Sequence, residues 1–475
     1  MAKIIASTLA EYQTRFWVLV GQELVRQGHE VLFLSFDSRS NEMLAAAGLS
    51  FMNATASAQA AALGAQDPLE VCRRFGVAQP VTWLTHEKFA FGIRDSDALL
   101  RKLAGALLLA NSAFDRFKGQ DETVLVQELG GFLSVLGSHF AAKARSVQSW
   151  FIEPSFYRGR LLFNEGSLAA MTVEADAAGA IHPEVTRYLA ETAANNRIVI
   201  PQKDRHQYTS AFRKVVNWRN ARRLAEKLRD KHLLRKEQEF GHIGTHVAAH
   251  ARMILASRTL ARHYTELHQA GEFVYYPLHV PGDVALTLRS PEYLDQAALI
   301  DYLCRVTPTT LNVAVKEHPA MIGAMGAETL LRLKRRYDRF VILPPGTNNY
   351  DVLRRAATVV TVNSKSGAEA GMLGRPVLVL GDAFYRNAPF AQPIDRLEQL
   401  APALYRAVGQ NATPEQEPEQ EPEAVQGYFA ALWDRTAPGE LYVETEQNIA
   451  SFTASLLQAV QPAAAGTTRA AARHG

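Results

Sequence analysis

Two short polar segments carry the residue types that a phosphate-binding site needs. Lys316-Glu317-His318-Pro319 follows a run of apolar and β-branched residues, and Asn363-Ser364-Lys365-Ser366-Gly367-Ala368-Glu369 follows another. Lysine and histidine can donate to phosphate oxygens, and hydroxyls with backbone N–H groups at the start of a helix form a ready anion site. Gly367 would let a ligand come close, and Glu369 could accept from ribose hydroxyls. Ordinary helix capping by Ser364 or Ser366 is the simpler alternative.

Both segments lie at the ends of predicted strands. Helical patterns separate four short β-branched or apolar runs: Leu311 to Val315, Phe340 to Leu343, Val359 to Val362 and Val377 to Leu380. This alternation predicts βαβ units and a parallel sheet, whose ligands lie beyond the carboxyl ends of the strands. We therefore predict one nucleotide-phosphate site that contains Lys316, His318, Ser364, Ser366, Gly367 and Glu369.

The first half of the chain predicts a second α/β unit. Lys3 to Ser7, a helix and Glu30 to Phe36 form a Rossmann-like opening that lacks the G-x-G-x-x-G phosphate fingerprint. We predict five segments: an N-terminal Rossmann-like acceptor domain with a helical insertion (1–270), a nucleotide-sugar-binding domain (271–410), a Glu/Gln/Pro linker (411–423), C-terminal helices (424–460) and a disordered tail (461–475).

Composition narrows the protein class. The 475 residues include 47% hydrophobic and 21% charged residues, as in ordinary globular proteins, and no apolar run is long enough to span a membrane. Cys72 and Cys304 make neither a disulfide framework nor a metal site, so we expect a cytoplasmic protein without a signal peptide. The basic stretch 203–236 indicates either a solvated helix or a surface for anionic lipid or an anionic acceptor. Nucleic acid is not expected as a partner.

Other charged residues suggest chemistry less directly. Glu153 and Asp283 each follow a predicted strand, in opposite halves, and two such carboxylates could meet across an interdomain cleft to act at a sugar carbon. The alternative is that each caps a turn. His242, His246 and His250 have metal-like spacing, but glycines interrupt the segment and no H-E-x-x-H motif is completed, so we predict no metal.

In combination, these motifs resemble those of the capsule polysaccharide biosynthesis proteins of the β-Kdo transferase type, GT-B glycosyltransferases that use CMP-Kdo. Lys316-Glu317-His318-Pro319 is similar to the family's K-x-H-P element, and Ser364 to Ala370 to its S-x-[ST]-G-x-E-A element. Leu278 to Asp283 and Glu153 to Arg158 resemble two weaker elements. Pro154 stands where some members carry Asp, and Ser155 replaces Gly.

The resemblance implies a two-domain α/β GT-B fold with C-terminal helices that cross back to the first half. It implies that His318, Ser364 and Ser366 hold the CMP phosphate and that Glu369 binds ribose. If the reactive carboxylate of some members is the missing Asp, its role passes to Asp283 as nucleophile, with Glu153 as acid/base. Four further residues are assigned to substrate contact: Arg158, Glu128, His279 and Arg289.

The implied activity is a retaining β-Kdo transfer from CMP-Kdo to a glycolipid or oligosaccharide acceptor, without cofactor or metal. The protein would be cytoplasmic, with peripheral contact to the inner membrane. Two alternatives stay open: a GT-B transferase with another CMP- or UDP-sugar, and a non-catalytic protein that binds glycan or an export partner.

Overall fold

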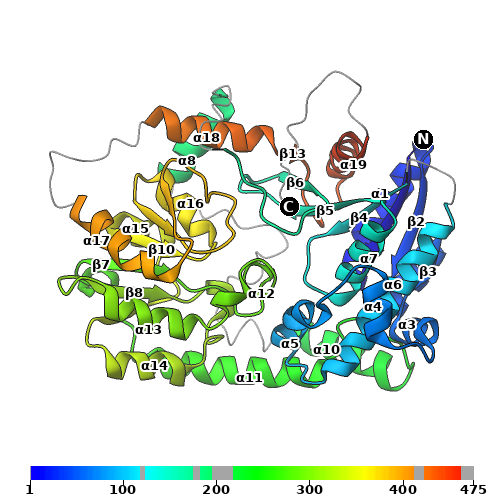
Figure 1. The fold of residues 1–475 in the computed structure, drawn as a ribbon, viewed down its shortest axis with the longest axis horizontal. Coiled ribbons are helices and arrows are strands. Elements are labelled where there is room, and N and C mark those ends of the chain that lie inside the picture. Colours follow the sequence, from blue (N-terminus) through cyan, green and yellow to red (C-terminus); the bar gives the residue numbers. More distant parts are fainter. Residues whose placement is uncertain (1, 118–122, 175–181, 195–217, 411–421, 462–475) are drawn as a thin grey trace.

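The computed structural model describes residues 2–117, 123–174, 182–194, 218–410 and 422–461, and contains two β-sheets flanked by helices (Figure 1). The first sheet has the order β13-β6-β5-β4-β1-β2-β3. Its strands are β1 (Lys3–Thr8), β2 (Glu30–Ser35), β3 (Phe51–Asn53), β4 (Thr123–Glu128), β5 (Gln148–Pro154), β6 (Arg160–Glu165) and β13 (Ala437–Pro438).

β1 to β5 are parallel, whereas β6 pairs antiparallel with β5, and β13 antiparallel with β6. The prediction that Glu153 follows a strand is wrong, because Glu153 lies within β5. β5 and β6 form a β-hairpin, in which Glu153 is paired opposite Leu162 and the turn contains Gly159, where φ is +73°. Only glycine adopts such a backbone angle without strain.

The second sheet has the order β12-β11-β10-β7-β8-β9 and is parallel throughout. Its strands are β7 (Phe273–Pro277), β8 (Asn312–Lys316), β9 (Phe340–Leu343), β10 (Ala356–Thr361), β11 (Val377–Val379) and β12 (Ala391–Pro393). Read from β9, this is the doubly wound order 3-2-1-4-5-6, in which the connection direction reverses between β7 and β10. The predicted parallel sheet is confirmed.

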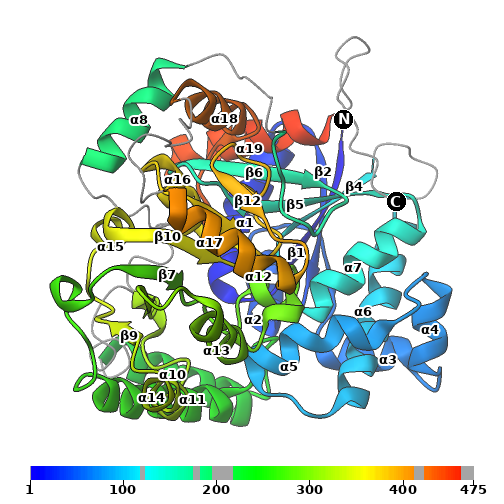
Figure 2. The same cartoon turned by 60° about the vertical axis from the view of Figure 1, so that its left-hand side comes forward.

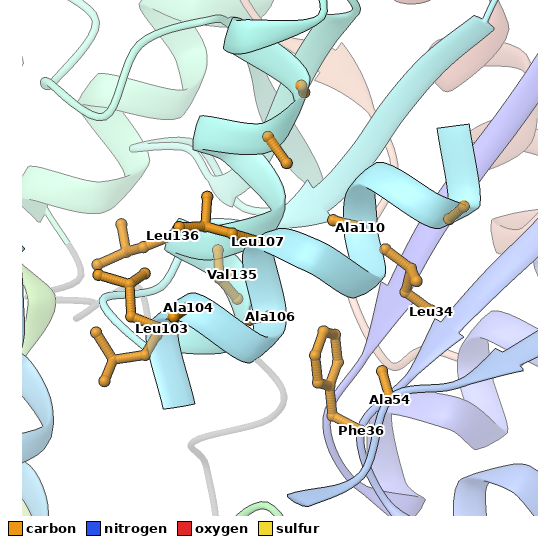
Figure 3. Packing of buried hydrophobic residues seen from close by; sticks show 14 of the residues in the cluster. Leu34, Phe36, Ala54, Leu103, Ala104, Ala106, Leu107, Ala110, Val135 and Leu136 are labelled. Carbon is orange, nitrogen blue, oxygen red and sulfur yellow. The ribbon is translucent and has the colours of Figure 1, made fainter. Parts of the chain in front are cut away.

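Helices cover both faces of each sheet because successive strand residues point to opposite sides. In β1, Ile5 packs with α6 and α7, whereas Ile4 and Ala6 pack with α1 and α19. Figure 3 shows Leu103, Ala104 and Leu107 of α6 beside Val135 and Leu136 of α7. The helices of this half are α1 (Glu11–Arg26), α2 (Ser38–Ala46), α3 (Ala56–Leu63), α4 (Pro68–Arg74), α5 (Thr85–Phe91), α6 (Ser96–Asp115) and α7 (Leu133–Ala144).

The second sheet divides its core in the same way, with Phe273 and Tyr275 on one face and Val274 and Tyr276 on the other. Its helices are α12 (Val284–Thr287), α13 (Gln296–Val306), α14 (Ala327–Arg336), α15 (Asn349–Arg355), α16 (Lys365–Met372) and α17 (Leu400–Gln410). In the sequence, the segment between β6 of the first sheet and β7 of the second forms α8 (Pro183–Ala194), α10 (Trp218–His232) and α11 (Ile243–Leu260).

Segments from each half pack with the other half. Phe156, Tyr157 and the α8 residues Val185 and Leu189 belong to the core beside the second sheet, where they meet α18 (Pro422–Asp434). In the opposite direction, α19 (Glu446–Val460) returns to the first sheet, and its Phe452 packs edge-on against Phe16 and Trp17. Two Rossmann-like sheets with a terminal helix that crosses back constitute the predicted GT-B architecture.

Three predicted segments lie wholly or partly outside the described residues. They are the linker, most of the C-terminal tail and the first part of the basic stretch. α18 begins at Pro422, two residues before the start predicted for the C-terminal helices.

Candidate functional site

The residues predicted to bind the nucleotide, and His279, gather at the carboxyl edge of the second sheet. Lys316 ends β8, Ser364 follows β10 and caps α16, and His279 follows β7. The backbone N–H of Asn363 approaches His279 Nε2 at 3.3 Å, which joins the β7 and β10 loops. This edge includes the position where the strand order reverses, the place where open α/β sheets bind their ligands.

Lys316 and Glu369 form the charged centre of this edge. Lys316 is 5% exposed, and burial lowers the pKa of its amine to about 8, although the nearby Glu369 opposes the shift. Burial raises the pKa of Glu369. Among the described residues, no group accepts a hydrogen bond from Lys316 Nζ. A buried amine in this state gains free energy when an anionic ligand reaches it.

Asn349, at the start of α15, organises the groups around this centre, and the sequence analysis missed it. Its side-chain amide donates to Ser366 Oγ at 3.0 Å and to Glu369 Oε2 at 2.7 Å, while its carbonyl oxygen accepts from Tyr275 Oη at 3.0 Å. The sequence feature that could have indicated Asn349 is the pair of adjacent asparagines after β9. Asn348 caps α15 through its bond with the Tyr350 N–H, and the next residue then points to the site.

The α16 N-terminus combines capping with site formation. Ser364 Oγ accepts from the Ser366 N–H at 3.3 Å, so the simpler capping role is present. The structure gives a reason for Gly367 other than close approach of a ligand. A Cβ at Gly367 would overlap the Tyr385 ring, whose hydroxyl donates to the Ser364 carbonyl. The glycine therefore makes room for a tyrosine that fixes the loop.

His318 and Glu317 have different surroundings. His318 is half-buried and close enough to His279 to lower the pKa of that imidazole, although burial is the main reason that this pKa is about 4. Glu317 accepts from the Gly323 N–H at 2.9 Å and from Tyr264 Oη at 3.4 Å, and burial raises its pKa to about 7. Glu317 thus fixes the loop that carries His318.

Asp283 is an exposed residue that caps α12, where its Oδ1 accepts from the Ala285 N–H at 2.8 Å. Its charge acts on two buried imidazoles, His279 of the second half and His86 of the first, and favours their protonated forms. The capping alternative therefore holds for Asp283. Its position between the two histidines also places it at the junction of the two halves.

Glu153 is not paired with Asp283 but with Arg289. Arg289 donates through Nη1 and Nη2 to the two carboxylate oxygens at 3.1 and 2.8 Å, and Asn164 donates to Oε1 at 2.6 Å. Arg289 also donates to the carbonyls of Leu168 and Ala169. Asp283 precedes the four-residue helix α12 and Arg289 follows it, so the two predicted carboxylates lie towards opposite ends of a helix roughly 6 Å long.

Further contacts tie the two halves together at this place. Lys365 Nζ donates to the Ser155 carbonyl at 2.9 Å, and the Ala170 N–H donates to Asp382 at 2.7 Å. His86 Nδ1 lies 2.7 Å from Thr287 Oγ1, which itself donates to the Asp283 carbonyl at 2.9 Å. Because the hydroxyl proton is used in that bond, Nδ1 of His86 must be the donor and Nε2 carries the lone pair.

Two residues assigned to substrate contact lie elsewhere. Glu128, at the end of β4, accepts from Trp17 Nε1 at 3.1 Å and from the Tyr442 hydroxyl, and so anchors the segment that leads into α19. Arg158 is exposed in the β5–β6 turn, where its N–H donates to Tyr188 Oη at 3.3 Å.

The histidine series does not gather ligands. His242 precedes α11, and its ring and that of His246 pack against Phe91 at centroid distances of 5.2 and 5.6 Å. Within the described ranges, no cluster of three or more His, Cys, Asp or Glu residues is arranged to hold a metal ion.

A family model described as capsule polysaccharide biosynthesis protein matches residues 137–391, more than half of the chain. The chain belongs to this family. The matched region contains β5, the α12 junction and the whole carboxyl edge described above. Membership confirms the family that the K-x-H-P and S-x-[ST]-G-x-E-A elements indicated.

One curated relative is Protein FixF of Sinorhizobium fredii, which is 30% identical over 138 residues, 28% of this chain and 32% of FixF. The chain thus spans about a third of the length of the curated relative it matches.

Two solved structures are similar at low identity. The Thermosulfurimonas dismutans KpsC β-Kdo 2,7 transferase matches with 15% identity and a TM-score of 0.34, over 73% of this chain and 88% of that one. S. aureus MnaA, in a structure with UDP, matches with 13% identity and a TM-score of 0.31, over 91% and 94%. The fold assignment rests on strand order and the crossing helix. No helix in the described part of the chain has both the length and the apolarity needed to cross a membrane.

Proposed function

We propose that the chain is a glycosyltransferase of bacterial surface polysaccharide synthesis, most specifically a retaining β-Kdo transferase with CMP-Kdo as donor and a glycolipid or oligosaccharide as acceptor. Family membership supports the biosynthetic role. The main observation that supports the enzymatic role is Lys316, which is buried beside Glu369 and the α16 N-terminus and has no hydrogen-bond acceptor among the described residues. A nucleotide phosphate would complete that arrangement.

In this proposal the donor lies across the carboxyl edge of the second sheet. Lys316 and His318 approach the phosphate, and Ser364 and Ser366 donate from their hydroxyls. The Glu369 carboxylate, oriented by Asn349, accepts from the ribose hydroxyls. No metal is needed for charge neutralisation if these groups and the helix dipole act on the departing phosphate.

The reacting carboxylate would be Asp283. One of its oxygens attacks the anomeric carbon of the donor sugar, the bond from that carbon to the phosphate oxygen breaks, and CMP leaves with the electron pair. An acceptor hydroxyl then attacks the same carbon, the Asp283 carboxylate leaves, and the hydroxyl proton passes to a base. Two displacements retain the anomeric configuration. Asp283 is favoured over Glu153 for the attack because Glu153 binds Arg289 through both oxygens.

Glu153 remains the proposed acid/base. In this proposal Glu153, on the first half of the molecule, faces the acceptor, and its ion pair with Arg289 fixes its position. An Arg289→Lys variant keeps the positive charge but loses the pair of hydrogen bonds that the guanidinium makes to the two carboxylate oxygens. It is therefore expected to lower the turnover number more than the affinity for CMP.

The direct test is acceptor-dependent release of CMP from freshly made CMP-Kdo. Asp283→Asn keeps the capping oxygen but removes the nucleophile, so we expect at least about a 1,000-fold loss of turnover with the helix intact. Asp295→Asn is the matched control because Asp295 caps α13 in the same way, through the Ala298 N–H at 3.0 Å. Full activity of Asp283→Asn would refute the nucleophile assignment. Tight binding of UDP but not CMP would refute the donor assignment.

A further inference from the structure

Helices α10 and α11 and the segment between them, residues 233–242, form one edge of the molecule, along the bottom of both views (Figures 1 and 2). We call the outward side of residues 222–262 the α10–α11 surface. Six of the thirteen exposed large hydrophobic residues of the described chain belong to it: Leu224, Leu228, Leu233, Leu234, Val247 and Leu255. Leu233 is 77% exposed and Leu255 64%. This stretch thus exposes far more apolar surface than its share of the chain.

The orientation of α10 explains this exposure. Asp230 is buried and pairs with Arg39 of α2, so this side of the helix faces the protein. Leu228 lies two positions earlier, about 200° around the helix, and Leu224 lies one turn from Leu228 on the same side. An ordinary surface helix turns its leucines inward. Here a charged residue attaches the helix and the leucines face outward.

Basic residues dominate the charges of this surface. The exposed charged residues among positions 222–262 are all basic: Arg222, Lys227, Arg229, Lys231, Arg235, Arg252, Arg258 and Arg262. The acidic residues are engaged with other groups of the protein. Asp230 pairs with Arg39, Glu239 with Lys102 and Glu226 with Arg222, while Glu237 accepts from Ser57. The surface therefore presents basic and aliphatic groups together.

We propose that the α10–α11 surface docks on an anionic lipid bilayer. Helices that lie in the headgroup region combine aliphatic side chains with flanking Lys and Arg, and each basic residue near an anionic leaflet adds attraction. The surface also adjoins the donor site. The α11 backbone at Met253 is so close to Gly323, in the loop after His318, that a Cβ on that glycine would overlap it. Docking would hold this loop near the lipid headgroups.

The proposal needs no catalytic activity, so its test is a binding experiment with the full chain. Flotation is measured with phosphatidylcholine vesicles and with vesicles in which about a third of the lipid is phosphatidylglycerol. Wild type should float with the anionic vesicles only, and less at high salt. Lys227→Glu with Arg252→Glu should weaken binding at least about tenfold, and so should Leu233→Ser with Leu234→Ser.

The matched control is Leu397→Ser with Arg406→Glu, which changes an exposed leucine and an exposed arginine next to and within α17 and should leave flotation unchanged. Thermal unfolding confirms that each variant is folded. Absence of wild-type flotation, or equal flotation with neutral vesicles, would overturn the proposal. So would full competition by a soluble anionic polysaccharide together with silent leucine substitutions, which would assign the surface to a polyanion.

Discussion

At the carboxyl edge of the first sheet, the polar side chains bond to one another. Ser7 Oγ donates to Gln127 at 3.4 Å, Gln127 donates to the Val135 carbonyl at 3.2 Å, and Glu128 accepts from Trp17 at 3.1 Å. Asp37 caps α2 through the N–H groups of Arg39 and Ser40. At the equivalent edge of the second sheet, Lys316 Nζ and the buried Nδ1 of His279 have no partner among the described residues.

The two sheets share a strand order, but their carboxyl edges differ in whether buried polar groups have partners within the protein. Burial of an ionisable group without a partner costs free energy, and a fold keeps such groups where a ligand will complete them. Polar groups that already hydrogen-bond to one another within the protein need no ligand to complete them. Thr8 Oγ1 at the first edge and Nε2 of His86, beside the loop after β4, also lack partners, but neither is a buried amine like that of Lys316. This contrast supports the proposal that the donor nucleotide binds at the second edge.

Among tests of this contrast, the largest effect on nucleotide binding is expected from removing the buried charge of Lys316. Lys316→Met should weaken CMP binding by about 10–100-fold, because a charge-assisted bond to phosphate contributes about 1.5–3 kcal/mol. Wild-type binding should also weaken as the pH rises through about 8, where the amine loses its proton. Calorimetric titration measures both effects. Ser7→Ala, at the first edge, is the control and should change the affinity by less than about threefold. Equal losses in the two variants would contradict the contrast.

A second prediction concerns stability against pH. The pKa of Glu317 is raised to about 7 in the folded state, so its contribution is fully present below the unfolded value of 4.5 and is lost as the pH rises through 7. The free energy of unfolding should fall by up to about 3 kcal/mol across this window.

Asp37 at the first edge behaves alike at lower pH, because its pKa is raised from 3.8 to about 6. Glu317→Gln should therefore flatten the decline between pH 6 and 7, whereas Asp37→Asn should act mainly below pH 6. Urea unfolding at several pH values distinguishes the two variants. An unchanged slope above pH 6 in Glu317→Gln would show that this carboxyl group does not titrate there.

The smallest effect tests the packing that shapes the α16 loop. Gly367→Ala should lower the free energy of unfolding by about 1–3 kcal/mol, because the new Cβ overlaps the Tyr385 ring. Gly409→Ala is the matched control, since nothing lies within 4 Å of its Cβ position and alanine favours the helix. If Gly367→Ala kept full stability but lost CMP binding, the earlier explanation, that the glycine admits the ligand, would be restored.

The sequence predicted the local features of this molecule well. Buried parallel strands are nearly continuous apolar runs, so the strands from Leu311 to Leu380 appeared close to their observed bounds, with Lys316 and Ser364 at their ends. The two family elements that carry Lys316 and Ser364 also lie at one edge of one sheet, as predicted.

Long-range pairings escaped prediction because they depend on tertiary structure. Glu153 and Arg289 are 136 positions apart, and no local pattern links them. Asn349 is one unremarkable polar residue whose three partners come from β7 and α16. The role of Gly367 depends on Tyr385, a residue that comes close only when the loop after β11 folds back.

The most direct test of the central claim is hydrogen–deuterium exchange of the wild-type chain with and without CMP. We expect CMP to slow exchange in peptides that cover residues 313–323 and 361–372, at the carboxyl edge of the second sheet, with little change at residues 6–13 and 127–134. Protection confined to the two first-sheet peptides, with the second edge unchanged, would contradict CMP binding at the second sheet.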